Sequence, residues 1–116
     1  MDKPVLSIVI PAYNEALRIG NTLQSIERYL NGNNEKFSYE ILVVDDGSTD
    51  GTVGVLQAFR ERLPGLQLLE NRINRGKGYS VKRGMLQAKG EYRLFMDADN
   101  SVDISQTSKS PSRFTV

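Results

Sequence analysis

The stretch YRLFMDAD, residues 92–99, is a short apolar run that ends in two carboxylates separated by one alanine. The apolar residues 94–96 predict a buried strand. In an extended chain alternate residues point to the same side, so the carboxylates of Asp97 and Asp99 would lie about 6–7 Å apart. Two such carboxylates repel each other unless a cation lies between them, and Ala98 is small enough to let a ligand come close. The pattern indicates either a metal site or two solvated acids at a strand end.

The composition restricts the chemistry that is possible. The chain has 116 residues, enough for one domain, and its 39% hydrophobic and 25% charged residues are typical of a globular protein. A net charge of +1, spread along the sequence, argues against a nucleic-acid partner. The sequence contains no cysteine and no histidine, which excludes thiol nucleophiles, disulfides, the usual zinc sites and imidazole catalysis. Any metal ion must therefore be held by oxygen ligands.

No targeting or membrane-spanning segment is evident in the sequence. The apolar run at residues 5–10 is too short for a signal peptide, and no other run approaches the length of a membrane span. We therefore expect a cytoplasmic location, which includes the cytoplasmic face of a membrane.

Apolar β-branched runs alternate with segments of helical periodicity throughout the chain. The predicted strands are residues 5–10, 39–44, 66–69 and 94–96, and the predicted helices are about 15–30, 50–62 and 79–88. Strands that alternate with helices indicate an α/β fold, with a mainly parallel sheet and helices on both of its faces.

Turn and capping residues set the expected limits of these elements. Pro11 is expected to end the first strand, and Asn14 to cap a first helix whose buried stripe includes Leu17. Thr49 or Asp50 is expected to cap the second helix. In the third helix Gly84 suggests close packing, and Gly90 is expected to close that helix at the C′ position.

Polar sequences follow three of the four predicted strands. They are residues 13–15, 45–48 and 97–99, whereas the third strand leads into a basic glycine-containing loop at residues 71–78. Ligands of parallel α/β sheets bind outside the carboxyl ends of the strands. We therefore expect these four segments to meet at one edge of the sheet and to form a binding site there.

The glycine-containing loop has features of an anion site. Gly76 and Gly78 permit positive φ angles, and backbone N–H groups near a helix N-terminus can form an anion-binding concavity, with Lys77 adding a charge. The spacing matches neither the P-loop nor the dinucleotide fingerprint. An ordinary loop with a surface lysine remains the alternative.

The other strand ends could contact a nucleoside. Asp45 and Asp46 could accept hydrogen bonds from a base or a ribose hydroxyl, or could belong to a turn only. Tyr13 could lie over a base, and Glu15 could contact it or simply favour the first helical turn. Together with a metal on Asp97 and Asp99, these segments describe a site for a nucleotide diphosphate with Mg²⁺ or Mn²⁺ as its cation.

Four motifs in order resemble those of family 2 glycosyltransferases, which have the GT-A fold. They are IPAYNE at residues 10–15, VVDDGSTDGT at 43–52, NRGKG at 74–78 and DAD at 97–99. The sequence is most similar to polyprenyl-phosphate (dolichyl-phosphate) glycosyltransferases, and more to their glucosyl than to their mannosyl branch. The resemblance covers residues 4 to about 104.

The resemblance implies a set of residues that bind a nucleotide-sugar donor. They are Pro11, Ala12, Tyr13, Glu15, Asp45, Asp46, Lys77, Gly78, Asp97, Ala98 and Asp99. By family pattern the first four line the base, and Asp45 and Asp46 hold base and ribose. Lys77 lies near the nucleotide, and Asp97 and Asp99 serve the metal and the diphosphate.

The resemblance also implies an activity. The family reaction inverts the anomeric centre, because an acceptor oxygen attacks it from the side opposite the diphosphate. UDP-glucose is the first choice of donor and GDP-mannose the second, and the acceptor is expected to be a polyprenyl phosphate.

Members of this family continue well beyond the length of this chain. Residues 1–104 are therefore expected to form a donor-binding half-domain and residues 105–116 a disordered tail of a truncated chain, with the acceptor site and the catalytic base missing. The alternative is an inactive nucleotide-sugar-binding fragment. Two other enzyme classes fit less well: receivers and phosphatases need acids after the first strand, and nucleotidyltransferases need a basic glycine loop there.

Overall fold

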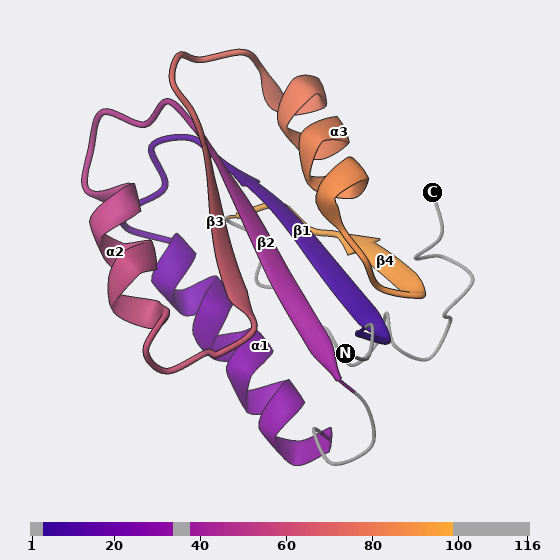
Figure 1. Cartoon of the computed structure of the whole chain (residues 1–116). Helices are drawn as coiled ribbons and strands as arrows, with labels where there is room; N and C mark the ends of the chain where they lie inside the picture. Colours follow the sequence, from indigo (N-terminus) through magenta and orange to yellow (C-terminus); the bar gives the residue numbers. More distant parts are fainter. Residues whose placement is uncertain (1–3, 34–37, 99–116) are drawn as a thin grey trace.

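A computed structural model of the chain describes residues 4–33 and 38–98 (Figure 1). Four strands alternate with three helices along this part of the sequence, as predicted. In chain order they are β1 (Leu6–Ala12), α1 (Ile19–Asn33), β2 (Tyr39–Asp46), α2 (Thr52–Phe59), β3 (Leu66–Asn71), α3 (Lys77–Gln87) and β4 (Tyr92–Phe95). The predicted tail at residues 105–116 lies outside the described residues.

The four strands form one parallel sheet in the order β3-β2-β1-β4. The register pairs Ile8 of β1 with Ile41 of β2 on one side and with Leu94 of β4 on the other. Every residue of β1 is buried, which explains why this strand is apolar almost throughout. Because all the strands run the same way, their carboxyl ends share one edge, as predicted.

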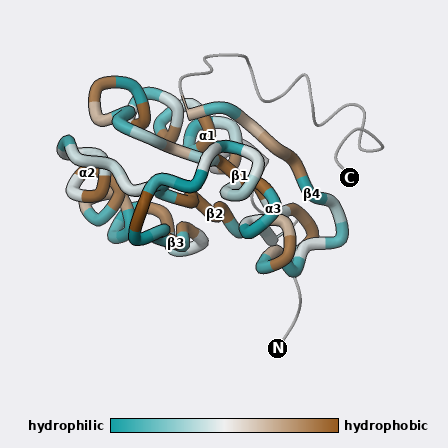
Figure 2. The backbone as a smooth tube through the Cα atoms, turned by 90° about the horizontal axis from the view of Figure 1, so that it is seen from above, coloured by the Kyte–Doolittle hydropathy of each residue, from teal (hydrophilic) through white to brown (hydrophobic). Residues whose placement is uncertain are grey.

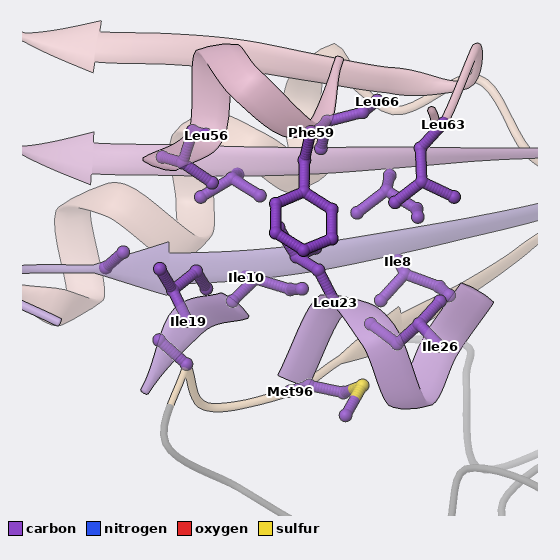
Figure 3. Packing of buried hydrophobic residues seen from close by; sticks show 14 of the residues in the cluster. Ile8, Ile10, Ile19, Leu23, Ile26, Leu56, Phe59, Leu63, Leu66 and Met96 are labelled. Carbon is purple, nitrogen blue, oxygen red and sulfur yellow. The ribbon is translucent and has the colours of Figure 1, made fainter. Parts of the chain in front are cut away.

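Helices cover both faces of the sheet, which confirms the predicted layers. Helices α1 and α2 pack together on one face, and α3 lies over β1 and β2 on the other (Figure 1). The larger core lies on the α1/α2 face, where Phe59 of α2 and Leu23 of α1 point toward Ile10 of β1 (Figure 3). A smaller core that includes Val9 and Leu42 lies under α3.

The segment between β1 and α1 departs from the prediction. Helix α1 begins at Ile19, and a turn precedes it in which the N–H groups of Arg18 and Ile19 both bond to the Glu15 carbonyl. Leu17, predicted to face the core, is 92% exposed. Asn14 does not cap α1, because its side chain bonds instead to the loop that follows β2. These two hydrogen bonds keep Asn14 out of helix α1.

Pro11 does not end β1, although its ring carries no N–H. It pairs in register with Val44, and the strand continues to Ala12. Val9 accepts a hydrogen bond from Met96 on the β4 side, and alternate residues of a strand bond to the same side. The missing N–H of Pro11 therefore faces the β4 side, beyond the last residue of β4, where no ladder bond is lost.

The limits of the strands at the carboxyl edge also differ from the prediction. Strand β2 extends through Asp45 and Asp46, so these acids belong to the strand and do not follow it. Strand β4 ends at Phe95, one residue before the predicted end, and Phe95 is 37% exposed, not buried. The reason is that α3 lies over β1 and β2, which leaves this side of β4 less covered.

Both later helices differ from the prediction at their ends. Helix α2 ends at Phe59, before the predicted residue 62, and its N-cap is Gly51 without a side-chain capping bond. Asp50 lies one position earlier, where its Oδ1 accepts the Thr52 N–H at 2.9 Å. Helix α3 begins at Lys77, two residues early, directly after Gly76, whose φ is 99°.

The predicted role of Gly90 is wrong, whereas that of Gly84 is confirmed. Helix α3 ends with Ala88 as an extended C-cap, and Gly90 does not have a positive φ. A Cβ on Gly84 would lie 2.4 Å from Cγ1 of Val9, so only glycine lets α3 approach β1 this closely.

Candidate functional site

A cavity of about 420 Å³ opens at the carboxyl edge of the sheet. Its lining residues come from the end of β1 and the segment after it, the end of β2, the start of α3 and the segment after β4: Pro11, Ala12, Tyr13, Glu15, Asp46, Lys77, Ser80, Asp97 and Ala98. Figure 2 looks down on the molecule from this side and shows the loops that follow β2 and β3, with many hydrophilic residues. All of the lining residues except Ser80 had been predicted as site residues.

Three predicted site residues are not part of this lining. Asp45 lies in register with Ala12, next to the cavity wall, but its side chain is on the other side of the sheet from that of Asp46. Gly78 lies within the first turn of α3, and its φ is not positive, although glycine would permit it. Asp99 lies outside the described residues.

Asp45 is a buried carboxylate with one oxygen still available. The residue is 2% exposed, and its Oδ2 accepts the Ser48 N–H at 3.1 Å. Within residues 4–33 and 38–98, Oδ1 has no hydrogen-bond partner. A buried oxygen of this kind costs free energy until a donor reaches it, which makes it a suitable acceptor for a ligand N–H or O–H.

Asn14 joins the loop after β1 to the loop after β2. Its Oδ1 accepts the N–H groups of Thr49 at 2.8 Å and Asp50 at 3.3 Å. Its own N–H donates to the Ser48 hydroxyl at 2.8 Å, and its φ is 52°. Asparagine is one of the few residues that tolerate this left-handed conformation. Asn14 therefore fixes the positions of its neighbours Tyr13 and Glu15 on the cavity wall.

Replacing Asn14 with Ala should lower the free energy of unfolding by about 1–2 kcal/mol, because the acceptor is lost and the left-handed φ becomes strained. Asn14→Asp keeps the acceptor and Asn14→Gly keeps the backbone conformation, so each should restore part of the loss. Urea unfolding of the three variants measures this. Equal stability of Asn14→Ala and the wild type would show that the tether does not hold the loops.

Lys77 and Asp97 connect the start of α3 with the segment after β4. Their Nζ and Oδ1 atoms are 2.6 Å apart, and Nζ also lies 5.2 Å from the centre of the Phe95 ring. The two side chains are 60% and 43% exposed, so water screens the pair and it contributes little to stability. The ammonium group is therefore free to exchange for another cation on Asp97.

The glycine-containing loop already binds an anion of its own chain. This is the loop whose backbone N–H groups could form an anion-binding concavity by sequence. In the structure the Arg75 and Gly76 N–H groups donate to the carboxylate of Asp46 at 2.7 and 2.8 Å. Of the predicted anion-binding groups, the Lys77 side chain is the one that lines the cavity.

The sequence analysis missed two polar residues that shape the site. Thr22 of α1 donates its hydroxyl to the Ala98 carbonyl at 2.6 Å and so anchors the segment that carries Asp97. Ser80 is fully buried on α3 and lines the cavity. A signal existed for each: Thr22 interrupts an apolar stripe of α1, and Ser80 lies one helical turn after Lys77.

The acidic residues that the structure describes at the cavity supply part of the ligand set of a divalent cation. Among the residues that the structure describes, no three acids lie close enough to enclose a metal ion. Asp97 nevertheless presents carboxylate oxygens at the cavity and already receives the cationic group of Lys77. Oxygen ligands of this kind suit Mg²⁺ and Mn²⁺. Asp99, the predicted second ligand, is not part of the described chain.

Comparison with known families agrees with this geometry. The family described as "Glycosyl transferase family 2" matches residues 7–109, almost the whole chain. The chain belongs to glycosyltransferase family 2. The resemblance noted in the sequence is thereby confirmed.

Curated relatives of this family 2 chain include several dolichyl-phosphate β-glucosyltransferases. The protein of this name from Dictyostelium discoideum is 41% identical over 108 residues, covering 89% of this chain and 33% of its own. The one from Drosophila melanogaster is 40% identical over 105 residues, covering 84% and 31%. The chain thus spans about a third of the length of these relatives.

Solved structures of proteins in complex with nucleotide sugars have the same fold. Staphylococcus aureus TarS 1–349 in complex with UDP-GlcNAc matches with a TM-score of 0.77 and 28% identity, covering 93% of this chain and 30% of that one. The mannosyltransferase PcManGT from Pyrobaculum calidifontis, in complex with GDP-Man and Mn²⁺, matches with a TM-score of 0.64 and 29% identity, covering 91% and 31%. The predicted GT-A fold is confirmed. Across the described elements, no helix has the length and apolar character needed to cross a bilayer.

Proposed function

We propose that this chain binds the nucleotide-sugar donor of an inverting glycosyltransferase at the carboxyl edge of its sheet, with a divalent cation on Asp97. The observation that carries the proposal is the cavity, which is lined by segments from four separate parts of the chain. The complexes of similar proteins with UDP-GlcNAc, and with GDP-Man and Mn²⁺, support it.

The contacts with the nucleoside are assigned to β1 and β2. Tyr13 is 46% exposed at the cavity, where its ring is available to lie over a base. Pro11, Ala12 and Glu15 complete this wall. Asp45, next to Ala12 in register, offers its unpartnered Oδ1 to a base N–H or a ribose hydroxyl. Asp46 also lines the cavity. Its Oδ1 accepts hydrogen bonds from Asn71 and Arg75, whereas its Oδ2 accepts one from Gly76, so the contact with base and ribose predicted for both acids is assigned to both.

The contacts with the diphosphate are assigned to α3 and the segment after β4. Asp97 and Asp99 would hold Mg²⁺ or Mn²⁺, which when bound neutralises the charge that builds up on the departing diphosphate. Lys77 starts from its ion pair with Asp97 and can turn its ammonium group to a phosphate oxygen at the same wall. Ala98, which follows Asp97, lines the same wall.

The relatives favour glucose as the sugar and a lipid phosphate as the acceptor. Several of them are dolichyl-phosphate β-glucosyltransferases, so UDP-glucose with a polyprenyl phosphate is the first choice and GDP-mannose the second donor. The oxygen of a lipid phosphate is already ionised and needs little help from a base, and none of the described residues is assigned as one. Such an acceptor would place the reaction beside a membrane.

Titration calorimetry of the chain with UDP tests the proposal. We expect saturable binding in Mn²⁺ that weakens about tenfold or more in EDTA, because the cation joins the diphosphate to Asp97. UMP, which lacks the second phosphate, should show little dependence on metal. Titration with GDP under the same conditions compares the two bases. Absence of saturable binding in Mn²⁺, or equal binding with and without metal, would contradict the proposal.

A further inference from the structure

The charges of the chain are less evenly distributed than its net charge of +1 suggests. Residues 72–90, which form the loop after β3, helix α3 and the turn before β4, contain six of the 15 lysines and arginines and none of the 14 acidic residues. The other basic residues share the rest of the chain with all of the acids. This segment is therefore a local concentration of positive charge, which attracts an anionic partner.

Helix α3 presents one side away from the sheet. It packs on β1 and β2, on the face opposite α1 and α2, and its residues Ser80 and Gly84 are buried there (Figure 1). Tyr79, Lys82 and Leu86 are spaced three and four residues apart, so they form one stripe along the helix, on the side away from the buried residues. All three are exposed, Tyr79 by 47% and Leu86 by 77%. The outer side of α3 thus carries a cation between two large apolar side chains.

The loop before α3 extends this stripe. The guanidinium carbon of Arg75 lies 5.2 Å from the centre of the Tyr79 ring. Ile73 is 61% exposed, and Arg72 is exposed next to it. Within residues 4–33 and 38–98, neither Arg72, Arg75 nor Lys82 forms an ion pair with a carboxylate. The charges of these three side chains are therefore available to a partner.

Together these residues form what we call the basic-apolar surface. It consists of Arg72, Ile73, Arg75, Tyr79, Lys82 and Leu86. Three of the six large apolar side chains that are exposed in the described part of the chain belong to it. The outer side of α1, by contrast, exposes the polar residues Asn21, Gln24 and Arg28. Exposed apolar side chains that gather among cations mark a site of interaction.

The chemistry of this surface fits the boundary of an anionic bilayer. Lysine and arginine bind lipid phosphates through their charged ends while their stems contact apolar groups, and tyrosine is stable where one end is apolar and the other wet. Leucine and isoleucine gain contacts in the acyl region, whereas the phosphate backbone of a nucleic acid offers them none. A bilayer therefore satisfies both the cations and the apolar side chains of this surface.

We propose that the basic-apolar surface docks this chain on an anionic lipid bilayer. Helix α3 begins at Lys77, which lines the cavity, so a docked bilayer would lie beside the cavity. A lipid-phosphate acceptor would then reach the cavity from that bilayer. This last step rests on the proposed function, whereas the docking itself does not.

Sedimentation of the chain with lipid vesicles tests the docking. Vesicles that contain phosphatidylglycerol and phosphatidylcholine in about a 1:2 ratio should bind the chain about tenfold or more tightly than vesicles of phosphatidylcholine alone. The difference should shrink as salt is added, because salt screens the attraction. Equal binding to the two kinds of vesicle, or no binding to either, would overturn the proposal.

Two pairs of matched variants locate the contact. Lys82→Glu should weaken vesicle binding about tenfold and Leu86→Ser about threefold, because each removes a contact of the basic-apolar surface. Arg28→Glu makes the same change of net charge on α1, and Leu17→Ser makes the same change of polarity before α1. These two controls should bind as the wild type does. Equal losses in Lys82→Glu and Arg28→Glu would show that net charge alone decides, against the proposal.

A tryptophan probe reports whether this side of α3 enters the bilayer. The chain contains no tryptophan, so Tyr79→Trp introduces a single one. Its emission should shift to shorter wavelength on the anionic vesicles and be quenched by brominated lipid. Gln24→Trp, on the outer side of α1, should show neither change. If vesicle-bound Tyr79→Trp were not quenched, α3 would not be the contact.

A short single-stranded RNA separates a bilayer surface from a surface for any polyanion. Added at the same phosphate concentration as the anionic lipid, the RNA should leave most of the chain on the vesicles. Displacement of the chain by RNA would show that phosphate charge alone is recognised and would overturn the proposal. None of these measurements contains a nucleotide sugar or Mn²⁺, so failure of the docking can be told apart from failure of the proposed function.

Discussion

Replacing Asp97 with Asn is expected to weaken Mn²⁺-dependent UDP binding by about ten- to a hundredfold. The substitution keeps the size of the side chain and removes the charge that a cation at the cavity needs, and charged contacts of this kind contribute about 1.5–3 kcal/mol. Asp97 lies on the cavity wall, and its carboxylate pairs with the Lys77 ammonium at 2.6 Å. The loss should be confined to binding in the presence of metal.

Glu61→Gln provides the control for this measurement, because it makes the same change of net charge on an exposed residue outside the cavity lining. Titration calorimetry with UDP, in Mn²⁺ and in EDTA, compares the two variants. We expect Glu61→Gln to bind as the wild type does, and Asp97→Asn to bind alike with and without metal. Equal affinity of the two variants in Mn²⁺ would exclude Asp97 as a ligand of the cation.

The sequence was sufficient to predict the arrangement of the fold and most of the cavity wall. Apolar β-branched runs such as that of β1 are dictated by burial on both faces of a sheet, and this constraint is local enough to appear in the sequence. The location of the site follows from topology, since parallel strands place Tyr13, Asp46 and Asp97 at one edge. The roles of these residues in binding remain predictions.

The details that could not be predicted depend on contacts between distant residues. Asparagine is a good helix cap by residue type, but the side chain of Asn14 accepts hydrogen bonds from Thr49 and Asp50. Helix α1 therefore begins only at Ile19, and Leu17 is exposed. The loop amides after β3 were predicted to bind a ligand anion, whereas Asp46 supplies that anion from within the chain. Neither pairing leaves a periodic signal in one sequence.

Gly90 is the position at which we expect a single added methyl group to destabilise the fold most. In Gly90→Ala the Cβ would lie 2.5 Å from Oγ of Ser7, 2.7 Å from its backbone nitrogen and 2.9 Å from the carbonyl carbon of Leu6. These backbone atoms belong to β1, which pairs with β2 on one side and β4 on the other. The strand cannot move away without breaking a ladder, so overpacking alone should cost about 1–3 kcal/mol.

A buried hydrogen-bond network adds to this loss. The Gly90 N–H donates to the Ser7 hydroxyl at 2.7 Å, and that hydroxyl donates to Glu40 at 2.6 Å. Glu40 is 6% exposed and also accepts the Lys89 N–H at 2.7 Å. Displacing residue 90 would loosen two donors to a buried carboxylate, which costs about a further 1–3 kcal/mol. A total of about 2–6 kcal/mol is a large share of the stability of a small domain.

Urea unfolding of Gly90→Ala and Gly54→Ala separates close packing from the general effect of replacing glycine. Gly54 lies in α2 with no atom within 4 Å of an added Cβ, so Gly54→Ala should raise the free energy of unfolding by about 0.5–1 kcal/mol through helix propensity. Gly90 belongs to the turn before β4, away from the cavity lining, so the folded fraction of Gly90→Ala should still bind UDP as the wild type does. If Gly90→Ala were as stable as the wild type, the close contact between this turn and β1 would have no part in holding the sheet together.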